Sequence, residues 1–150
     1  MNADQDLVLI VEDDPDDRAL LARAFRKAEI GVPLHFAEDG EHAVSFLAGV
    51  SGRESPGPRL MVVLLDLKLP RRSGFEVLDW MKRHETLRRV PVVVLTSSGE
   101  HSDIERAYDL GANSYLVKPT RPDALLRMVA QIDAYWLGLN EAPARRRSAP

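Results

Sequence analysis

Five carboxylates lie within six residues of the chain, directly after the apolar run VLIV: Glu12, Asp13, Asp14, Asp16 and Asp17. Such side chains repel one another and resist leaving water, so a cluster of them needs a cation, hydrogen-bond donors or open solvent. With neither cysteine nor histidine among them, they form a hard oxygen set of the kind that magnesium prefers. We expect Asp13 to bind the metal directly and Glu12, longer by one methylene, to hold a metal-bound water.

Three more polar residues end later apolar runs: Asp66 in VVLLDLKLP, Thr96 in VVVLTSSG and Lys118 in SYLVKPT. If these runs are parallel strands, their carboxyl ends meet at one edge of the sheet, where open α/β proteins bind their ligands. Asp66 interrupts an apolar run that resumes at Leu67 and Leu69, which argues against a simple return to polar surface. We therefore expect these residues to converge on the acidic cluster.

The predicted set can take up a phosphoryl group. Magnesium held by Asp13 and Asp66 would neutralise the carboxylates and orient a phosphoryl donor, so that Asp66 could attack phosphorus in line and form an acyl phosphate. Lys118 would supply a fixed positive charge, and Thr96 a hydroxyl donor, for the new phosphate oxygens. The sequence thus predicts a magnesium-dependent phosphoacceptor.

Alternating strands and helices are expected to position these residues. Short apolar runs at residues 7–11, 60–65 and 92–95 predict strands covered on both faces, and 32–37 and 114–117 predict two weaker strands. Each strand is followed by a helical pattern, at residues 15–29, 40–49, 74–84, 102–110 and 122–136. Five strands that are each followed by a helix predict a parallel α/β sheet with helices on both faces.

Composition limits the classes of function. The 150 residues, 45% of them hydrophobic, suffice for one domain, which we place at residues 1–137, and 138–150 is expected to be a flexible tail. A net charge of −3 argues against nucleic-acid and anionic-membrane partners. The chain has no cysteine and no apolar run near the roughly 20 residues that cross a bilayer. We expect a cytoplasmic protein.

Five separated motifs carry a family resemblance: the acidic pair after the first strand, Asp66 in a DxxLP context, Gly74, Thr96 and Lys118-Pro119. In this order they resemble the receiver domain of two-component response regulators, over residues 7 to 135. The resemblance implies a flavodoxin-like (βα)5 fold, with a doubly wound five-stranded parallel sheet in the order 2-1-3-4-5.

The resemblance also implies residue roles. Asp66 would accept phosphate from a sensor histidine kinase, and the backbone carbonyl of Lys68 would be a third metal ligand. Tyr115 matches the aromatic residue that turns inward when Thr96 moves toward the phosphate. The family also implies a cis peptide bond before Pro119, which aims the preceding lysine into the site. The protein would assist its own phosphorylation and dephosphorylation without being an enzyme in the ordinary sense.

A narrower resemblance is to the single-domain response regulators paired with bacterial and cyanobacterial phytochromes. It rests on the polar loop at residues 51–59, DLKLPRRSGFEVL, AYDLGANSYLVKP and above all AYWLGLNE. This similarity implies a phytochrome-type kinase as partner. Since nothing after residue 137 could fold as a DNA-binding domain, the signal is expected to leave through protein contacts.

The end of the fifth helix predicts a homodimer. Tyr135, Trp136 and Leu137 remain after its sheet-facing side is assigned, and a small monomer seldom exposes so much apolar surface together. A symmetric dimer would bury this patch, with a contribution from Ile104 and Tyr108 on the fourth helix. The alternative is that the aromatic pair folds back onto its own domain.

Two other functions use similar residues. A haloacid-dehalogenase-type phosphohydrolase also has an aspartate nucleophile and magnesium, but it needs a second acid two residues later, where this chain has Lys68. A pseudo-receiver would keep the fold as a binding module without being phosphorylated. The presence of every expected site residue argues against it.

Overall fold

The computed structural model of the protein describes residues 6–51 and 59–143. In this part of the chain, five strands alternate with five α-helices, as predicted. The elements are β1 (Asp6–Val11), α1 (Pro15–Lys27), β2 (Leu34–Ala37), α2 (Gly40–Ser51), β3 (Arg59–Leu65), α3 (Gly74–Arg83), β4 (Val92–Thr96), α4 (His101–Asp109), β5 (Ser114–Val117) and α5 (Pro122–Ile132). A short 3-10 helix, Leu87–Arg89, precedes β4. Most of the polar loop expected at 51–59 lies outside the described residues.

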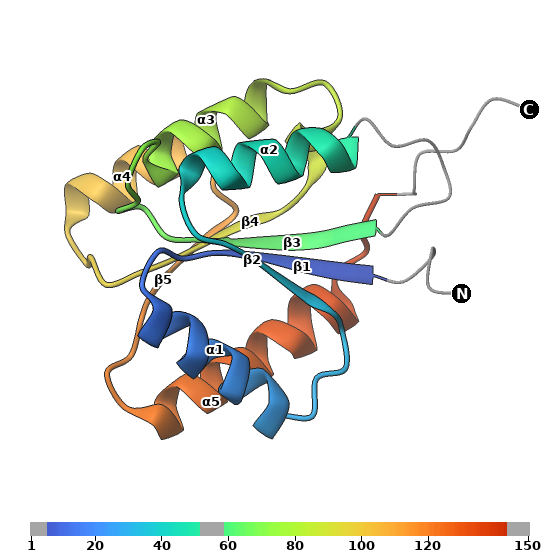
Figure 1. Ribbon diagram of the computed structural model, residues 1–150, viewed down its shortest axis with the longest axis vertical. Coiled ribbons are helices and arrows are strands. Elements are labelled where there is room, and N and C mark those ends of the chain that lie inside the picture. The colour runs from blue at the N-terminus through green and yellow to red at the C-terminus, as the bar shows by residue number, and fades with distance from the viewer. Residues whose placement is uncertain (1–5, 52–58, 144–150) are drawn as a thin grey trace, which may run out of the picture.

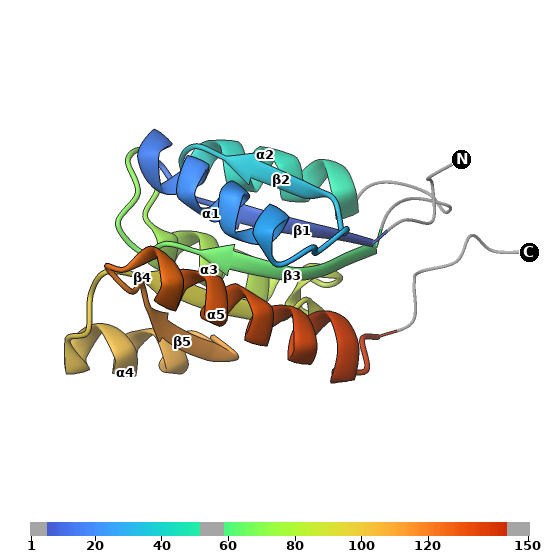
Figure 2. The ribbon, with the colours of Figure 1, turned by 90° about the horizontal axis from the view of Figure 1, so that it is seen from below.

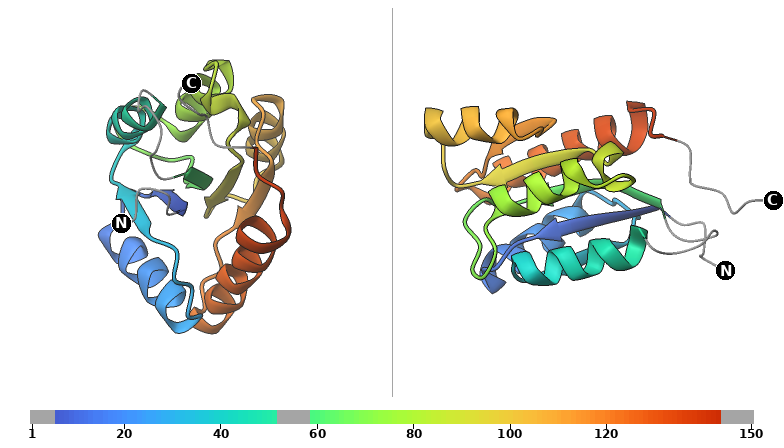
Figure 3. Two further views of the ribbon diagram at one scale, coloured as in Figure 1. Left: turned by 90° about the vertical axis from the view of Figure 1, so that its right-hand side faces the viewer. Right: turned by 90° about the horizontal axis from the view of Figure 1, so that it is seen from above.

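The strands form one parallel sheet in the order β2-β1-β3-β4-β5, which confirms the flavodoxin-like topology. Ile10 of β1, for example, pairs with Phe36 on one side and Leu64 on the other. Helices α1 and α5 cover one face of the sheet, and α2, α3 and α4 cover the other (Figures 1 and 3). Because the inner strands are covered on both faces, their sequences are apolar at almost every position.

Alternation along the strands divides the core into two layers. Leu9 and Val11 of β1 belong to the cluster that packs beneath α2 and α3, whereas Val8 and Ile10 belong to the cluster beneath α1 and α5. Successive strand side chains point to opposite faces, so each strand contributes to both layers. The central strands are therefore fixed from two sides, and their carboxyl ends form a rigid base for the loops that follow.

Local signals set where α1 begins and where α4 ends. The Asp14 side chain accepts a hydrogen bond from the Asp16 amide at 2.8 Å and so caps α1, which begins at Pro15. Gly111 follows α4 with a φ of +107°, the left-handed conformation that glycine adopts without strain at a helix end. Both ends agree with the predicted ranges to within one residue, and the cap of α1 leaves the acidic cluster where β1 passes into α1.

The C-terminal end departs from the expected boundary. A π-helical segment, Asp133–Leu139, continues α5 to two residues beyond the boundary that we placed at residue 137. The Asn140 amide closes this segment by donating to the Tyr135 carbonyl at 2.6 Å. Residues 144–150 of the expected tail lie outside the described part of the chain. Within the described ranges, each helix is too short or too polar to cross a bilayer.

Candidate functional site

The polar residues that follow β1, β3 and β5 are held by an extension of the sheet's own hydrogen-bond ladder. Glu12 donates its amide to Ala37 O (3.0 Å), Asp66 to Val11 O (3.1 Å) and Lys118 to Thr96 O (2.7 Å). These strand ends lie together at the left of Figure 1, away from both chain termini. The backbone thus places the predicted residues at one edge, as the parallel topology requires.

Asp66 is the centre of this edge and is only 7% exposed. One carboxylate oxygen, Oδ1, accepts hydrogen bonds from the Thr96 hydroxyl at 2.7 Å and from the Lys68 amide at 3.3 Å. The other, Oδ2, accepts from Lys118 Nζ at 3.1 Å. Both oxygens of this buried carboxylate therefore have hydrogen-bond donors, so neither is left unsatisfied by burial.

Lys118 contacts three carboxylates. Besides Asp66, it forms ion pairs with Glu12 and, at 3.1 Å, with Asp17. Burial acts to lower the pKa of the Lys118 amine, but the hydrogen bond to Glu12 and the charge of Asp66 outweigh it, and the pKa lies above its ordinary value. The amine therefore keeps its positive charge beside the acids.

Asp17 was not among the residues predicted for the site. Its position in the first turn of α1 was visible in the sequence, and that helix begins only a few residues after β1. A side chain in this turn can point back toward the sheet edge. The placement of Asp17 beside Lys118 depends on the rotamers of both residues, which the sequence pattern does not specify.

Glu12 is the most deeply buried acid of the cluster, with 2% of its surface exposed. Burial raises the pKa of its carboxyl to about 7, and the charge of Asp66 adds to the rise. Hydrogen bonds from Lys118 and the Asp14 amide oppose it. Because this pKa is near 7, the Glu12 carboxyl is partly protonated at neutral pH. A cation bound at this edge would favour the charged carboxylate and displace the proton.

A cation-binding set is present at this edge. Glu12, Asp13 and Asp66 each offer an oxygen, and these oxygens all lie within 4.8 Å of one another. Carboxylate oxygens alone are the ligand type that suits magnesium or manganese. The Glu12 oxygen lies within the same 4.8 Å limit as the oxygens of Asp13 and Asp66, the two residues predicted to bind the metal directly. Lys68, expected to contribute its carbonyl, has an exposed side chain and an amide directed at Asp66.

Tyr115 is tied to the loop between β4 and α4. Its hydroxyl donates to the Ser98 carbonyl at 2.8 Å, and its ring packs against the core on the α4 side of the sheet. The Ser98 hydroxyl donates in turn to Asp103 of α4 at 2.6 Å. Burial raises the pKa of the Tyr115 phenol, so it remains a neutral donor. Ser98 lies two residues after Thr96, and Tyr115 therefore contacts the backbone next to the site.

The residues predicted for a dimer interface fall into separate groups. Trp136 and Leu137 are partly buried against the core beneath α1 and α5, so of the aromatic pair only Trp136 folds back onto its own domain. Tyr135 is 48% exposed, and its ring meets that of Trp136 edge to face at 4.8 Å. On α4, Ile104 is half-buried and Tyr108 is exposed. Helix α4 and the C-terminal end of α5 lie toward opposite ends of the molecule (Figure 2).

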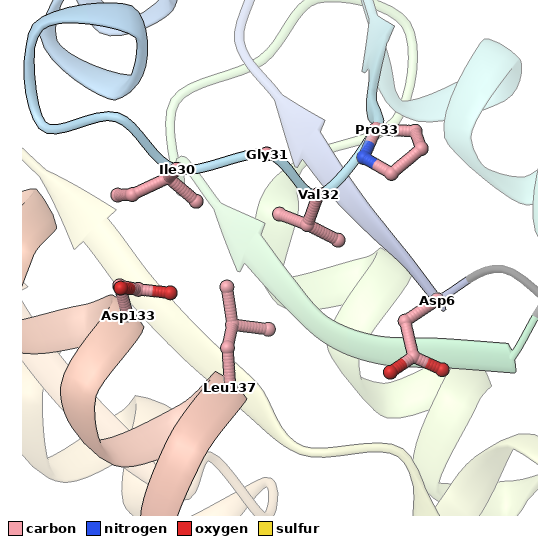
Figure 4. A pocket seen from close by; sticks show the side chains of 7 residues that line it. All are labelled: Asp6, Ile30, Gly31, Val32, Pro33, Asp133 and Leu137. Carbon is pink, nitrogen blue, oxygen red and sulfur yellow. The ribbon is translucent and has the colours of Figure 1, made fainter.

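A cavity of about 280 Å³ lies at the opposite end of the sheet from the acids. Figure 4 shows Asp6, Val32 and Leu137 on its walls, from the beginning of β1, the loop before β2 and the segment after α5. It contains none of the residues predicted for phosphoryl chemistry. The cavity and the acidic edge are therefore separate features of the molecule.

Two known proteins match nearly the whole length of this chain. The chain is 42% identical over 137 residues to a probable methanogenesis regulatory protein, FilR2, of Methanothrix harundinacea, a match that covers 91% of this chain and 87% of the relative. It is 37% identical over 138 residues to response regulator Rcp1 of Synechocystis, which covers 92% and 93%.

Solved structures of response regulators also match this chain over nearly its whole length. The Mn²⁺-bound form of Rcp1 matches with a TM-score of 0.80 and 37% identity, over 93% of this chain and 99% of the other. The phosphorylated cyanobacterial phytochrome response regulator RcpA matches with a TM-score of 0.83 and 31% identity, over the same shares. The family model of the response regulator receiver domain matches residues 8–130. This chain belongs to the response regulator receiver domain family.

Proposed function

We propose that the protein is a single-domain response regulator whose Asp66 accepts a phosphoryl group from a sensor histidine kinase. The observation that carries the proposal is the pair of contacts to Asp66: Thr96 donates to one carboxylate oxygen and Lys118 to the other. These donors come from two other strands, β4 and β5, so the fold assembles them for this carboxylate.

The proposed transfer conserves atoms and charge. A carboxylate oxygen of Asp66 forms the new P–O bond while the P–N bond of the donor's phosphohistidine breaks, and the imidazole nitrogen keeps the electron pair. Lys118 and Thr96 are placed to donate to the oxygens of the incoming phosphoryl group. Attack by water on phosphorus later returns free Asp66 and inorganic phosphate, so the protein is a phosphoacceptor that catalyses only its own turnover.

Magnesium fits the acids of this chain. Asp13, Asp66 and Glu12 would hold it, with the Lys68 carbonyl as a further ligand, and the Mn²⁺-bound form of the relative Rcp1 supports this assignment. A bound divalent cation would neutralise the clustered carboxylates and orient the phosphoryl donor. Burial is the main cause of the raised pKa of Glu12, and a bound divalent cation would lower it again.

The kinase is proposed to be of the phytochrome type and to act in the cytoplasm. Relatives that match nearly the whole chain include a phytochrome response regulator, RcpA, and RPA3017, a response regulator in red light signaling of R. palustris. Tyr115 and Ser98 connect the site to α4, so a change at Thr96 would reach the surface there. We propose that the signal leaves through protein contacts, including a homodimer.

The two alternatives conflict with the site. A hydrolase of the haloacid-dehalogenase type would have an acid at Lys68, and that side chain points into solvent. A pseudo-receiver has no requirement for a buried carboxylate with a hydroxyl and an ammonium group on its two oxygens.

Intact-mass spectrometry tests the function. The protein is incubated with magnesium and acetyl phosphate, and separately with an autophosphorylated phytochrome-type histidine kinase. We expect one phosphoryl group per chain, released by hydroxylamine, and none on Asp66→Asn. Asp13→Asn should recover phosphorylation in part at high magnesium. Stoichiometric phosphate on Asp66→Asn, or none on the wild type with either donor, would refute the assignment.

A further inference from the structure

We propose that Arg71 and Arg72, in the loop between β3 and α3, lock that loop onto residues 39–41, where the chain turns into α2, and thereby position the metal-binding edge. This inference rests on the proposed function, because it assigns a role in magnesium binding. The arginines are positioning residues: both pair with acids outside the Glu12, Asp13 and Asp66 cluster.

Two ion pairs join the loop to the turn. Arg72 Nε lies 2.6 Å from Glu41 Oε1, and Arg71 Nε lies 3.4 Å from Asp39 Oδ2. Asp39 makes a second contact: its Oδ1 accepts a hydrogen bond from the His42 amide, at 2.8 Å, at the beginning of α2. The turn is therefore fixed to its own helix by one oxygen of Asp39 and to the neighbouring loop by the other.

The two backbones also touch. A Cβ atom at Gly40 would lie 1.9 Å from the carbonyl oxygen of Arg72, so only glycine permits this approach. Arg71 has a φ of +70°, a left-handed conformation that is unfavourable for a residue with a side chain. A loop free in solvent would relax from it. We infer that the contacts with the turn hold Arg71 in this conformation.

These ion pairs connect the two segments that flank the acidic edge, the turn after β2 and the loop after β3. The turn follows Ala37, whose carbonyl accepts the Glu12 amide at 3.0 Å. The loop follows Asp66, and its Lys68 amide donates to Asp66 Oδ1 at 3.3 Å. The Lys68 carbonyl that would bind the metal thus lies on a segment whose far end is pinned by Arg71 and Arg72. Fixing this segment against the turn limits how far the Lys68 carbonyl can move from the acids.

Replacing Arg72 tests the proposal, because a nearby charge and a positioning contact predict opposite changes in magnesium affinity. If Arg72 acted only as a nearby cation, Arg72→Ala would make the edge more negative and tighten magnesium binding. If it positions the loop, the same change should weaken binding, by about threefold to fivefold for an ion pair of this exposure. Isothermal titration calorimetry of the full chain with magnesium measures the difference. Equal or tighter binding by Arg72→Ala would overturn the proposal.

Two further variants distinguish the loss of this ion pair from a general loss of stability. The swap Glu41→Arg with Arg72→Glu rebuilds the ion pair in reverse and should restore most of the lost affinity, whereas Arg72→Glu alone should not. Arg83→Ala removes an ion pair with Asp79 of similar length, 3.0 Å, on the exposed face of α3, and should leave magnesium binding unchanged. Failure of the swap to restore affinity would contradict a positioning role.

The proposed function can fail independently. If the wild type neither binds magnesium nor takes up phosphate, that function is wrong, and the lock has no role in metal binding. If the wild type does both and Arg72→Ala binds magnesium as well as the wild type, only the lock is wrong. Asp39→Asn tests the second ion pair, because its amide oxygen can still accept from His42 while the charge that pairs with Arg71 is lost.

Discussion

Lys118 Nζ lies 3.1 Å from Oδ2 of Asp66, although the two residues are 52 positions apart in the sequence. The contact exists because β3 and β5 run parallel on either side of β4, so that their carboxyl ends face the same edge. The contact also places the Lys118 ammonium group where negative charge would grow during phosphoryl transfer. The consequences of removing it can be measured.

We expect Lys118→Met to keep magnesium binding but to slow phosphorylation by about a hundredfold, the usual effect of removing one preorganised donor from a developing charge. Methionine has a similar length and no charge, so packing changes little. Removal of the cation leaves the acids more negative, and magnesium should bind at least as tightly. Phosphorylation with acetyl phosphate, followed by mass spectrometry, gives the rate. A rate within a factor of about three of the wild type would exclude the proposed role of Lys118.

The second prediction concerns the stability of the metal-free protein as a function of pH. The folded pKa of Glu12, about 7, lies above its ordinary 4.5, so the folded state holds this proton more tightly than the unfolded state does. The free energy of unfolding should therefore fall as pH rises from about 4.5 to about 7, by roughly 3 kcal/mol from this residue.

Glu12→Gln isolates this effect. Its neutral amide does not titrate, so the stability difference between wild type and variant should change across that pH range and be constant above it. Burial lowers the pKa of His35, which changes stability in the opposite direction at low pH, but it does so in both proteins and cancels. Urea unfolding in EDTA, followed by circular dichroism, supplies the curves. Parallel curves for the two proteins would show that Glu12 does not titrate in this window.

Gly74 is the subject of the third prediction. A Cβ atom there would lie 2.1 Å from the backbone oxygen of Asp66, so Gly74→Ala must displace the phosphoacceptor or α3. We expect a loss of about 1–3 kcal/mol in stability, typical of overpacking, together with slower phosphorylation. Gly49→Ala is the matched control, because nothing lies within 4 Å of its added methyl group and alanine favours the helix. If both variants behave alike, the close approach at Gly74 is not limiting.

The sequence specified the framework of the site better than its details. Strand ends could be predicted for Asp66, Thr96 and Lys118, because apolar runs covered on both faces stop abruptly where polar residues begin. Asp17 and Ser98 could not be assigned, since their contacts depend on rotamers in loops and first turns. The pairing of Arg71 with Asp39 was hidden for the same reason: the two lie in different loops, and no periodic pattern connects them.

The helix end shows another limit of sequence patterns. Helical periodicity assigns Leu125, Met128, Val129 and Ile132 to the sheet-facing side of α5. The structure buries three of them and packs Met128 partly against the same core. Beyond Ile132 the chain changes to π-helical turns, which rotate successive residues by a smaller angle than an α-helix does. Trp136 and Leu137 therefore reach the core, although α-helical spacing had placed them outside it.

The last prediction is a homodimer, now with a smaller set of residues. Tyr135 is 48% exposed and Leu139 is 74% exposed, and both lie on the segment after α5. Neither is needed to cover the core, in contrast to Trp136, so changing them tests association without unfolding the domain. We expect the wild type to be a dimer by light scattering, and Tyr135→Ser with Leu139→Ser to be a monomer that is still folded by circular dichroism. Tyr108→Ser, on the exposed side of α4, shows whether that helix contributes. Measurements with and without magnesium and acetyl phosphate report any dependence on phosphorylation. A wild type that is monomeric in every condition, or a double variant that still dimerises, would rule out this surface as the dimer interface.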